Sequence, residues 1–298
     1  MSKLKAVAPA DIDPGHIKAI LFGRPGAGKT WLALGFPKPY YIDTEGGARL
    51  RHYTERLTTA GGSYMGPNEG ANDLAAIVEQ VQALATERHE FKTLVIDSIT
   101  KPFLTAVANE QERLGDKDAF GASKKPAVAQ MRRLINWLHK IDMNVFLIAH
   151  EISEWGLANG QRTEIGKTAD VYDKLLYDLD LTLQIRAHNA KRRDAVVFKT
   201  RLTGFPAGDV IILQDGEDRG YEEIATRYGK DFIEKEATPI QIASAEQVEQ
   251  ITKLFEALNM SEDQIAKLLT KANAETIAEI DTATAGKLIT WLKQKTEV

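Results

Sequence analysis

The stretch Gly23-Arg-Pro-Gly-Ala-Gly-Lys-Thr30 decides how the rest of the sequence is interpreted. It matches the pattern G-x-x-x-x-G-K-[ST], which has chemical meaning when a strand precedes it and a helix follows. The apolar run Ile17–Phe22 reads as that strand, and Trp31–Leu34 continues as the start of a helix. The pattern therefore predicts a phosphate-binding loop, and the alternative of a glycine turn without a ligand does not explain this context.

Such a loop predicts binding of ATP with Mg²⁺. Its glycines let backbone N–H groups turn inward around the β-phosphate, helped by the N-terminus of the following helix. Lys29 would reach the β- and γ-phosphates, and the Thr30 hydroxyl would ligate Mg²⁺. The residues expected to contact the nucleotide are Gly23, Arg24, Pro25, Gly26, Ala27, Gly28, Lys29, Thr30 and Trp31.

Carboxylates at the ends of two further apolar runs complete a hydrolytic site. Asp97 follows Leu94–Ile96, where a ligand of the Mg²⁺ ion or its water belongs, although an Asp there also serves as a helix N-cap. Glu45 is the candidate for polarising the attacking water, with Asp43 as the second candidate. The alternative is that both carboxylates only shape the turn at Gly46-Gly47.

The fold class follows from the alternation of strand and helix patterns. Apolar runs without clean alternation are typical of buried parallel strands, and they are Ile17–Phe22, Tyr40–Ile42, Leu94–Ile96, Val145–Ala149, Leu179–Ile185, Ala195–Phe198 and Val210–Leu213. Helical stretches between the earlier runs are Asp73–Glu87, Thr100–Leu114 and Lys125–Lys140. We predict an α/β fold with a doubly wound, mostly parallel sheet and antiparallel strands at one edge.

The C-terminal residues have a different character. Two capping boxes, Ser244–Gln247 and Ser261–Gln264, each precede apolar residues at helical spacing, and a third helix is expected over Thr282–Lys295. We therefore predict an ATPase core over residues 1–238 and a three-helix module over residues 244–298.

Composition limits the remaining possibilities. The 298 residues contain no cysteine, which excludes disulfides and cysteine-based sites, and the net charge is −4. We find neither a signal peptide nor a membrane span, so we expect a cytoplasmic protein. The six histidines show no metal-ligand spacing.

The order of these motifs resembles a known family. Gly23–Thr30, Ile42-Asp-Thr-Glu-Gly46 and Val95-Ile-Asp-Ser98 are similar to the core of the RecA and RadA recombinases. The short spacing looks most like the RecA-like core proteins of bacteriophages, which are single-strand annealing or strand-exchange recombinases. The resemblance covers about residues 15–213. It implies ATP hydrolysis at subunit interfaces, self-assembly into a ring or filament on single-stranded DNA, and a bacterial host cytoplasm.

The resemblance also implies roles for residues outside the phosphate loop. His150 stands where the family carries a γ-phosphate sensor, although Asn or Gln is usual there, and a histidine that only ends a core strand is the alternative. Lys199 and Arg201 match the paired basic fingers that reach the ATP of a neighbouring subunit. The run Lys191–Arg193 is left open as the finger, a DNA contact or a solvated turn.

Two loops are expected to face DNA. They are Gly115–Pro126 and Ile152–Thr168, and their candidate contacts are Lys124, Lys125, Trp155, Arg162 and Lys167. Acidic residues in both segments leave ordinary surface loops as the alternative. The C-terminal module is expected to be a docking element, with a single-strand DNA-binding protein as its candidate partner.

Three other functions stay open at this point. A P-loop ATPase with a protein client, such as a helicase loader or assembly chaperone, would keep every nucleotide residue. A small-molecule kinase or GTPase is less favoured, because no Asn-Lys-x-Asp motif is present. A nucleotide-gated binding module that scarcely hydrolyses ATP is the third.

Overall fold

The computed structural model describes residues 14–115, 122–158 and 161–296. The strands are β1 (Lys18–Phe22), β2 (Pro39–Asp43), β3 (Ser63–Met65), β4 (Thr93–Asp97), β5 (Asn144–Ala158), β6 (Gln161–Asp170), β7 (Leu181–Asn189), β8 (Arg192–Thr200), β9 (Val210–Asp215) and β10 (Glu217–Asp218). The α-helices are α1 (Lys29–Ala33), α2 (Arg51–Thr59), α3 (Leu74–Thr86), α4 (Thr100–Leu114), α5 (Lys124–Lys140), α6 (Asp173–Asp178), α7 (Gly220–Tyr228), α8 (Lys230–Ile233), α9 (Ala245–Ala257), α10 (Glu262–Lys271) and α11 (Thr282–Thr296). Short 3₁₀ turns are η2 (Gly47–Arg49), η3 (Pro67–Glu69) and η5 (Ile277–Glu279).

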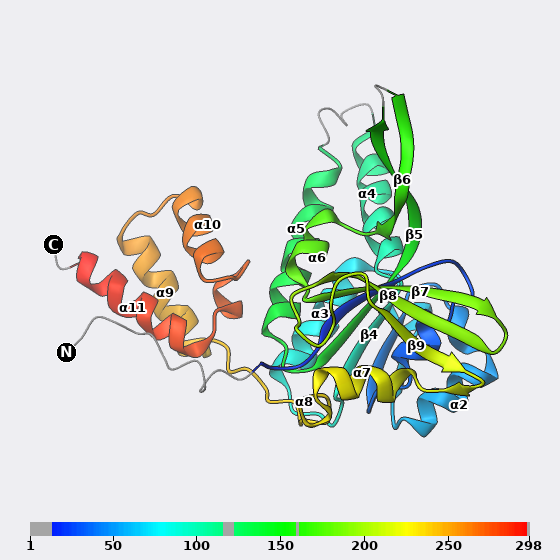
Figure 1. The fold of residues 1–298 in the computed structure, drawn as a ribbon. Coiled ribbons are helices and arrows are strands. Elements are labelled where there is room, and N and C mark those ends of the chain that lie inside the picture. Colours follow the sequence, from blue (N-terminus) through cyan, green and yellow to red (C-terminus); the bar gives the residue numbers. More distant parts are fainter. Residues whose placement is uncertain (1–13, 116–121, 159–160, 297–298) are drawn as a thin grey trace. The chain divides into compact units, whose positions relative to one another are not determined.

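The strands form one twisted sheet in the order β10-β9-β8-β7-β1-β5-β4-β2-β3 (Figure 1). The six strands from β7 to β3 run parallel, whereas β8, β9 and β10 add antiparallel pairings at one edge. The predicted fold class is therefore confirmed. Because parallel strands share one carboxyl edge, the residues that follow β1, β2 and β4 lie together there with His150, where β5 leaves its pairing with β1.

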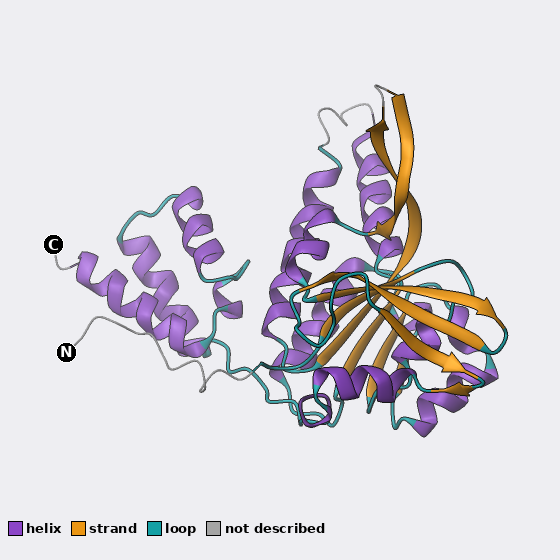
Figure 2. Cartoon of the chain, viewed as in Figure 1, coloured by secondary structure: helices purple, strands orange, loops and turns teal. Residues whose placement is uncertain are grey.

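The segment expected to be the second DNA loop is instead a β-hairpin. Strand β5 continues past the sheet as far as Ala158, and β6 returns antiparallel to it, so that Ile152 pairs with Thr168 (Figure 2). A bulge interrupts the register between Glu154 and Trp155. The loop prediction was wrong because the glycines were interpreted as flexible, although the β-branched residues around them pair readily across a two-stranded ribbon.

The first predicted loop also ends earlier than expected. Lys124 and Lys125 form the first turn of α5 and are not loop residues, while residues 116–121 lie outside the described part of the chain. Pro126 is the third residue of this helix, where its missing N–H would lack a helical acceptor in any case. The proline therefore does not delay the start of the helix.

Contacts divide the chain into two compact units. The first contains residues up to 71, together with 90–102 and 142–237, and holds the whole sheet. Its buried core combines strand residues such as Leu21, Phe146 and Leu183 with Phe36 and Phe205. The second contains residues 72–89, 103–141 and those from 238 onward.

Within the second unit, both predicted capping boxes are present. The Ser244 hydroxyl accepts the backbone N–H of Gln247 at 3.2 Å, and Ser261 caps α10 in the same way. Helices α9 and α11 enclose a small core that includes Ile251, Phe255 and Leu292. The C-terminal helices therefore have an apolar interior of their own, while the predicted domain division stays a prediction.

A buried ion pair joins η5 to α5 in this unit. The Glu279 side chain is only 3% exposed, and its Oε1 lies 2.6 Å from Nε and from Nη2 of Arg133. Its Oε2 accepts the backbone N–H of Glu275.

None of the helices in the described part of the chain combines the length and apolar character that a membrane span requires.

We expect Arg133→Met to lower the free energy of unfolding by about 3 kcal/mol, because it leaves the buried Glu279 carboxylate without its charge partner. Denaturant melts measure this loss. Arg132→Met removes an exposed arginine at the adjacent position and is the control, with an expected change below about 0.5 kcal/mol. Equal stability of the two variants would contradict a structural role for the pair.

Candidate nucleotide site

The phosphate loop is shaped by a close approach between strands β1 and β7. A Cβ on Gly23 would lie 2.2 Å from the carbonyl oxygen of Ile185, so only glycine fits. The Nζ of Lys29 donates to the carbonyls of Gly23 at 2.8 Å and of Arg24 at 3.1 Å. Burial lowers the pKa of Lys29, while the nearby Asp97 opposes this shift. The lysine thus spans the loop and can turn to phosphate oxygens.

Thr30 and Asp97 lie together at the carboxyl edge of the sheet. The Thr30 hydroxyl donates to Asp97 Oδ2 at 2.5 Å, and the Tyr41 hydroxyl donates to the same oxygen at 3.2 Å. Burial raises the pKa of Asp97, and the hydrogen bond from Thr30 opposes that shift. A hydroxyl and a carboxylate side by side are oxygen donors of the kind that Mg²⁺ takes beside phosphate groups. The pair therefore fits the predicted metal site, where the ion would neutralise phosphate charge.

The two acidic residues after β2 have different partners. Asp43 is 2% exposed, and its Oδ1 accepts the backbone N–H groups of Glu45 and Gly46 at 3.2 and 2.8 Å. Glu45 instead points to Ser98, whose Oγ lies 2.7 Å from Glu45 Oε1. Asp43 therefore shapes the turn, as the alternative interpretation required, while Glu45 has an exposed carboxylate beside the metal-site strand.

Strand β5 adds two residues to this edge, just past its last pairing with β1. His150 Nε2 lies 3.0 Å from Glu45 Oε1, and the imidazole is half exposed. Glu151 accepts a hydrogen bond from Gln184 Nε2 at 2.9 Å and lies 3.7 Å from the Arg24 guanidinium. The sequence placed His150 at this edge, whereas the contact of Glu151 with the phosphate loop was not anticipated.

Lys199 and Arg201 are held by carbonyls of their own chain. The Lys199 ammonium donates to the carbonyl of Leu179, and Arg201 donates to those of Tyr177 and Asp178 at the end of α6. Arg201 also lies 3.7 Å from Asp180. These contacts within the chain neither support nor exclude the prediction that Lys199 and Arg201 reach the nucleotide of a neighbouring subunit.

A cavity of about 320 Å³ adjoins the phosphate loop. It is lined by Gly26, Gly28, Trp31, His52, Tyr53, Arg193, Gln214 and Asp218. Aromatic and cationic side chains beside a phosphate cradle can hold a base and ribose. Sequence reasoning did not single out His52, Tyr53, Gln214 or Asp218, because they come from α2 and the sheet edge and share no spacing with the motif.

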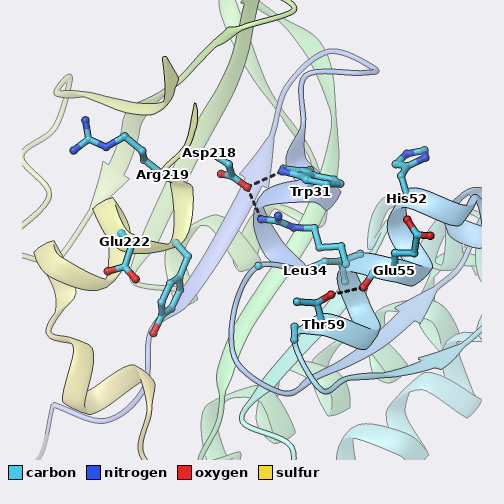
Figure 3. Close-up of a pocket in the computed structure, with 12 residues that line it drawn as sticks. Trp31, Leu34, His52, Glu55, Thr59, Asp218, Arg219 and Glu222 are labelled. Atoms are coloured by element: carbon cyan, nitrogen blue, oxygen red, sulfur yellow. Dashed lines mark hydrogen bonds and ion pairs between the residues drawn. The ribbon is translucent and has the colours of Figure 1, made fainter. Parts of the chain in front are cut away.

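A second cavity, of about 570 Å³, is lined by Trp31, by α2 residues such as Glu55 and by Asp218 (Figure 3). There Asp218 accepts a hydrogen bond from Trp31 Nε1 at 2.8 Å and pairs with Arg56 Nη2 at 2.9 Å. The Arg56 guanidinium stacks 4.1 Å from the Trp31 ring. Trp31 is therefore fixed between α2 and the tip of β10, and its role as a nucleotide contact stays a prediction.

The family model described as an AAA domain matches residues 16–211, which is more than half of the chain. The chain belongs to this family. The matched residues of the AAA domain contain the phosphate loop, Glu45, Asp97 and the β5–β6 hairpin, and the family implies nucleotide binding by a P-loop ATPase domain. Among curated proteins, none matches the chain.

We expect Glu45→Gln to lower ATP turnover by about 10²–10⁴-fold, because the amide cannot accept a proton from the attacking water. Binding of Mg-ATP should persist, since Glu45 lies outside the phosphate cradle. Steady-state phosphate release and nucleotide titration measure the two quantities. Glu112→Gln, which alters an exposed carboxylate on helix α4, is the control, and full turnover in Glu45→Gln would show that the residue does not activate water.

Proposed function

We propose that this AAA domain is an ATP-dependent, single-stranded-DNA-binding protein of the phage recombinase or annealing type. One observation carries the proposal. Strand β5 is continuous over 15 residues, with His150 and Glu151 beside the phosphate loop and Trp155 on the projecting hairpin. A single strand thus connects the nucleotide site to an exposed aromatic residue.

The hairpin presents chemistry suited to unstacked bases. The Trp155 ring is 52% exposed, and the Arg162 guanidinium of β6 lies 5.0 Å from its centroid. An aromatic face with a cation beside it can stack a base and attract the adjoining phosphate without reading sequence. This supports contact with single-stranded DNA along the ribbon.

Lys167 lies at the base of the hairpin. Its ammonium pairs with Glu164 at 2.6 Å and donates to Ser153 at 3.0 Å. It also lines a cavity of about 390 Å³ together with Arg24–Ala27 of the phosphate loop. Because Glu164 already compensates its charge, we infer that Lys167 contributes little free positive charge to DNA binding. Its main role would be to couple the occupancy of the nucleotide site to the hairpin.

Hydrolysis would use Lys29, Thr30 and Asp97 around Mg-ATP, and Glu45 on the water. Lys199 or Arg201 would come from a neighbouring copy in a ring or filament, which requires exchange of their present contacts with residues 177–179. The C-terminal helices remain our candidate for docking a single-strand DNA-binding protein.

A protein client is the second candidate function. Leu157 is 81% exposed and Ile165 is 60% exposed on the same hairpin. Apolar side chains gathered on a projecting ribbon are typical of protein contacts. In this second candidate function the nucleotide-binding residues keep the same roles, and the hairpin binds a protein instead of DNA.

We expect single-stranded DNA to stimulate ATP hydrolysis, and Trp155→Ala to weaken DNA binding by about 5- to 100-fold, because a stacked base contributes roughly 1–3 kcal/mol. The basal rate should not change. Fluorescence titration with oligonucleotides and ATP turnover, at low and high salt, measure both.

Trp291→Ala is a matched control, because Trp291 is 40% exposed and lies under a lysine, Lys295, at 4.7 Å in α11. It should leave DNA binding unchanged. If DNA does not change ATP turnover and no DNA binding is found in the presence of ATP, the DNA proposal is wrong and the protein client is favoured.

A further inference from the structure

Arg193 on strand β8 lies against the phosphate loop of its own chain. A Cβ on Gly28 would lie 3.0 Å from Cδ and 3.1 Å from Nε of Arg193. The left-handed backbone of Gly28, with φ of 102°, already excludes most side chains there. The guanidinium stem thus packs on the residue immediately before Lys29.

The guanidinium is positioned but not neutralised. Its Nη1 donates to Gln214 on β9, while its buried Nε has no hydrogen-bond partner among the described residues. Asp218, which lines the same cavity, pairs with Arg56 and accepts from Trp31. The adjacent Asp194 pairs with Arg186 and His188. In the described part of the chain, no carboxylate lies within ion-pair distance of Arg193. A partly buried cation of this kind favours an anionic ligand.

We propose that Arg193 binds the α- and β-phosphates of the nucleotide held by the same chain. It lines the cavity beside the phosphate loop, together with Gly26, Gly28 and the aromatic residues His52 and Tyr53. Because Arg193 contacts Gly28 of the same chain, it would bind the nucleotide held by that chain. Lys199 and Arg201 differ from it, since they are the candidates for a neighbouring chain's site. The inference rests on the nucleotide site and is independent of DNA binding.

The test compares the binding of ADP and of a non-hydrolysable ATP analogue, with Mg²⁺ and without DNA. We expect Arg193→Met to weaken both ligands by about 10- to 100-fold and to a similar extent, because both carry the two phosphates. Arg192→Met, which removes the exposed neighbour on the same strand, should change neither affinity by more than about twofold. Thermal melting without nucleotide checks that each variant folds. If Arg193→Met does not fold, Arg193→Gln is tested in its place, and the same weakening is expected.

Mixing separates a site within one chain from a site shared between chains. Lys29→Ala protein keeps Arg193 but lacks the phosphate-binding lysine, so it could supply Arg193 to a neighbouring nucleotide. Recovery of turnover when it is added to Arg193→Met protein would overturn the proposal, as would unchanged affinities or weakening of the ATP analogue alone. Loss of both affinities without recovery on mixing supports it, whatever the response to DNA.

Discussion

Strand β1 is hydrogen-bonded between β5 and β7, and the position of every chemical group at the site depends on this pairing. Phe22, its last residue, is in register with Ala149 on one side and with Gln184 on the other. The next residues of the three strands, Gly23, His150 and Ile185, therefore meet at one edge. The Ile185 carbonyl occupies the space that a side chain at position 23 would need. Glycine is thus required there by strand packing before any phosphate is considered.

The same edge gives three neighbouring carboxylates different chemistry. Asp43 and Asp97 are in register on β2 and β4, yet one accepts backbone N–H groups and the other the Thr30 hydroxyl. Glu45 turns toward Ser98 and His150. Since all three have the same functional group, their partners and burial decide which can hold a cation and which can take a proton.

The structural features that the sequence predicted are those that depend on local residue patterns. Buried runs predicted the parallel strands β1, β2, β4, β5 and β7, but not the three-residue β3. Ser244 and Ser261 predicted two helix starts, because capping depends on residues three positions apart. The β5–β6 hairpin was missed, since most of its residues are solvent-exposed and leave no burial pattern. Arg193, Gln214 and Asp218 reach the phosphate loop only because β8, β9 and β10 are added beyond β7, and no sequence spacing records that geometry.

Strand β8, which pairs with β7 on one side and β9 on the other, carries a cation near each of its ends. Arg193 stands near its start and Lys199 near its end, six positions apart, which corresponds to about 20 Å along an extended strand. Arg193 packs on Gly28 of the phosphate loop, whereas the Lys199 ammonium donates to the Leu179 carbonyl. Under the proposed assembly, Lys199 or Arg201 would serve the ATP of a neighbouring copy. Strand β8 would then contact its own nucleotide at one end and a neighbour's at the other, and this arrangement would give a physical basis for coupling ATP sites through assembly.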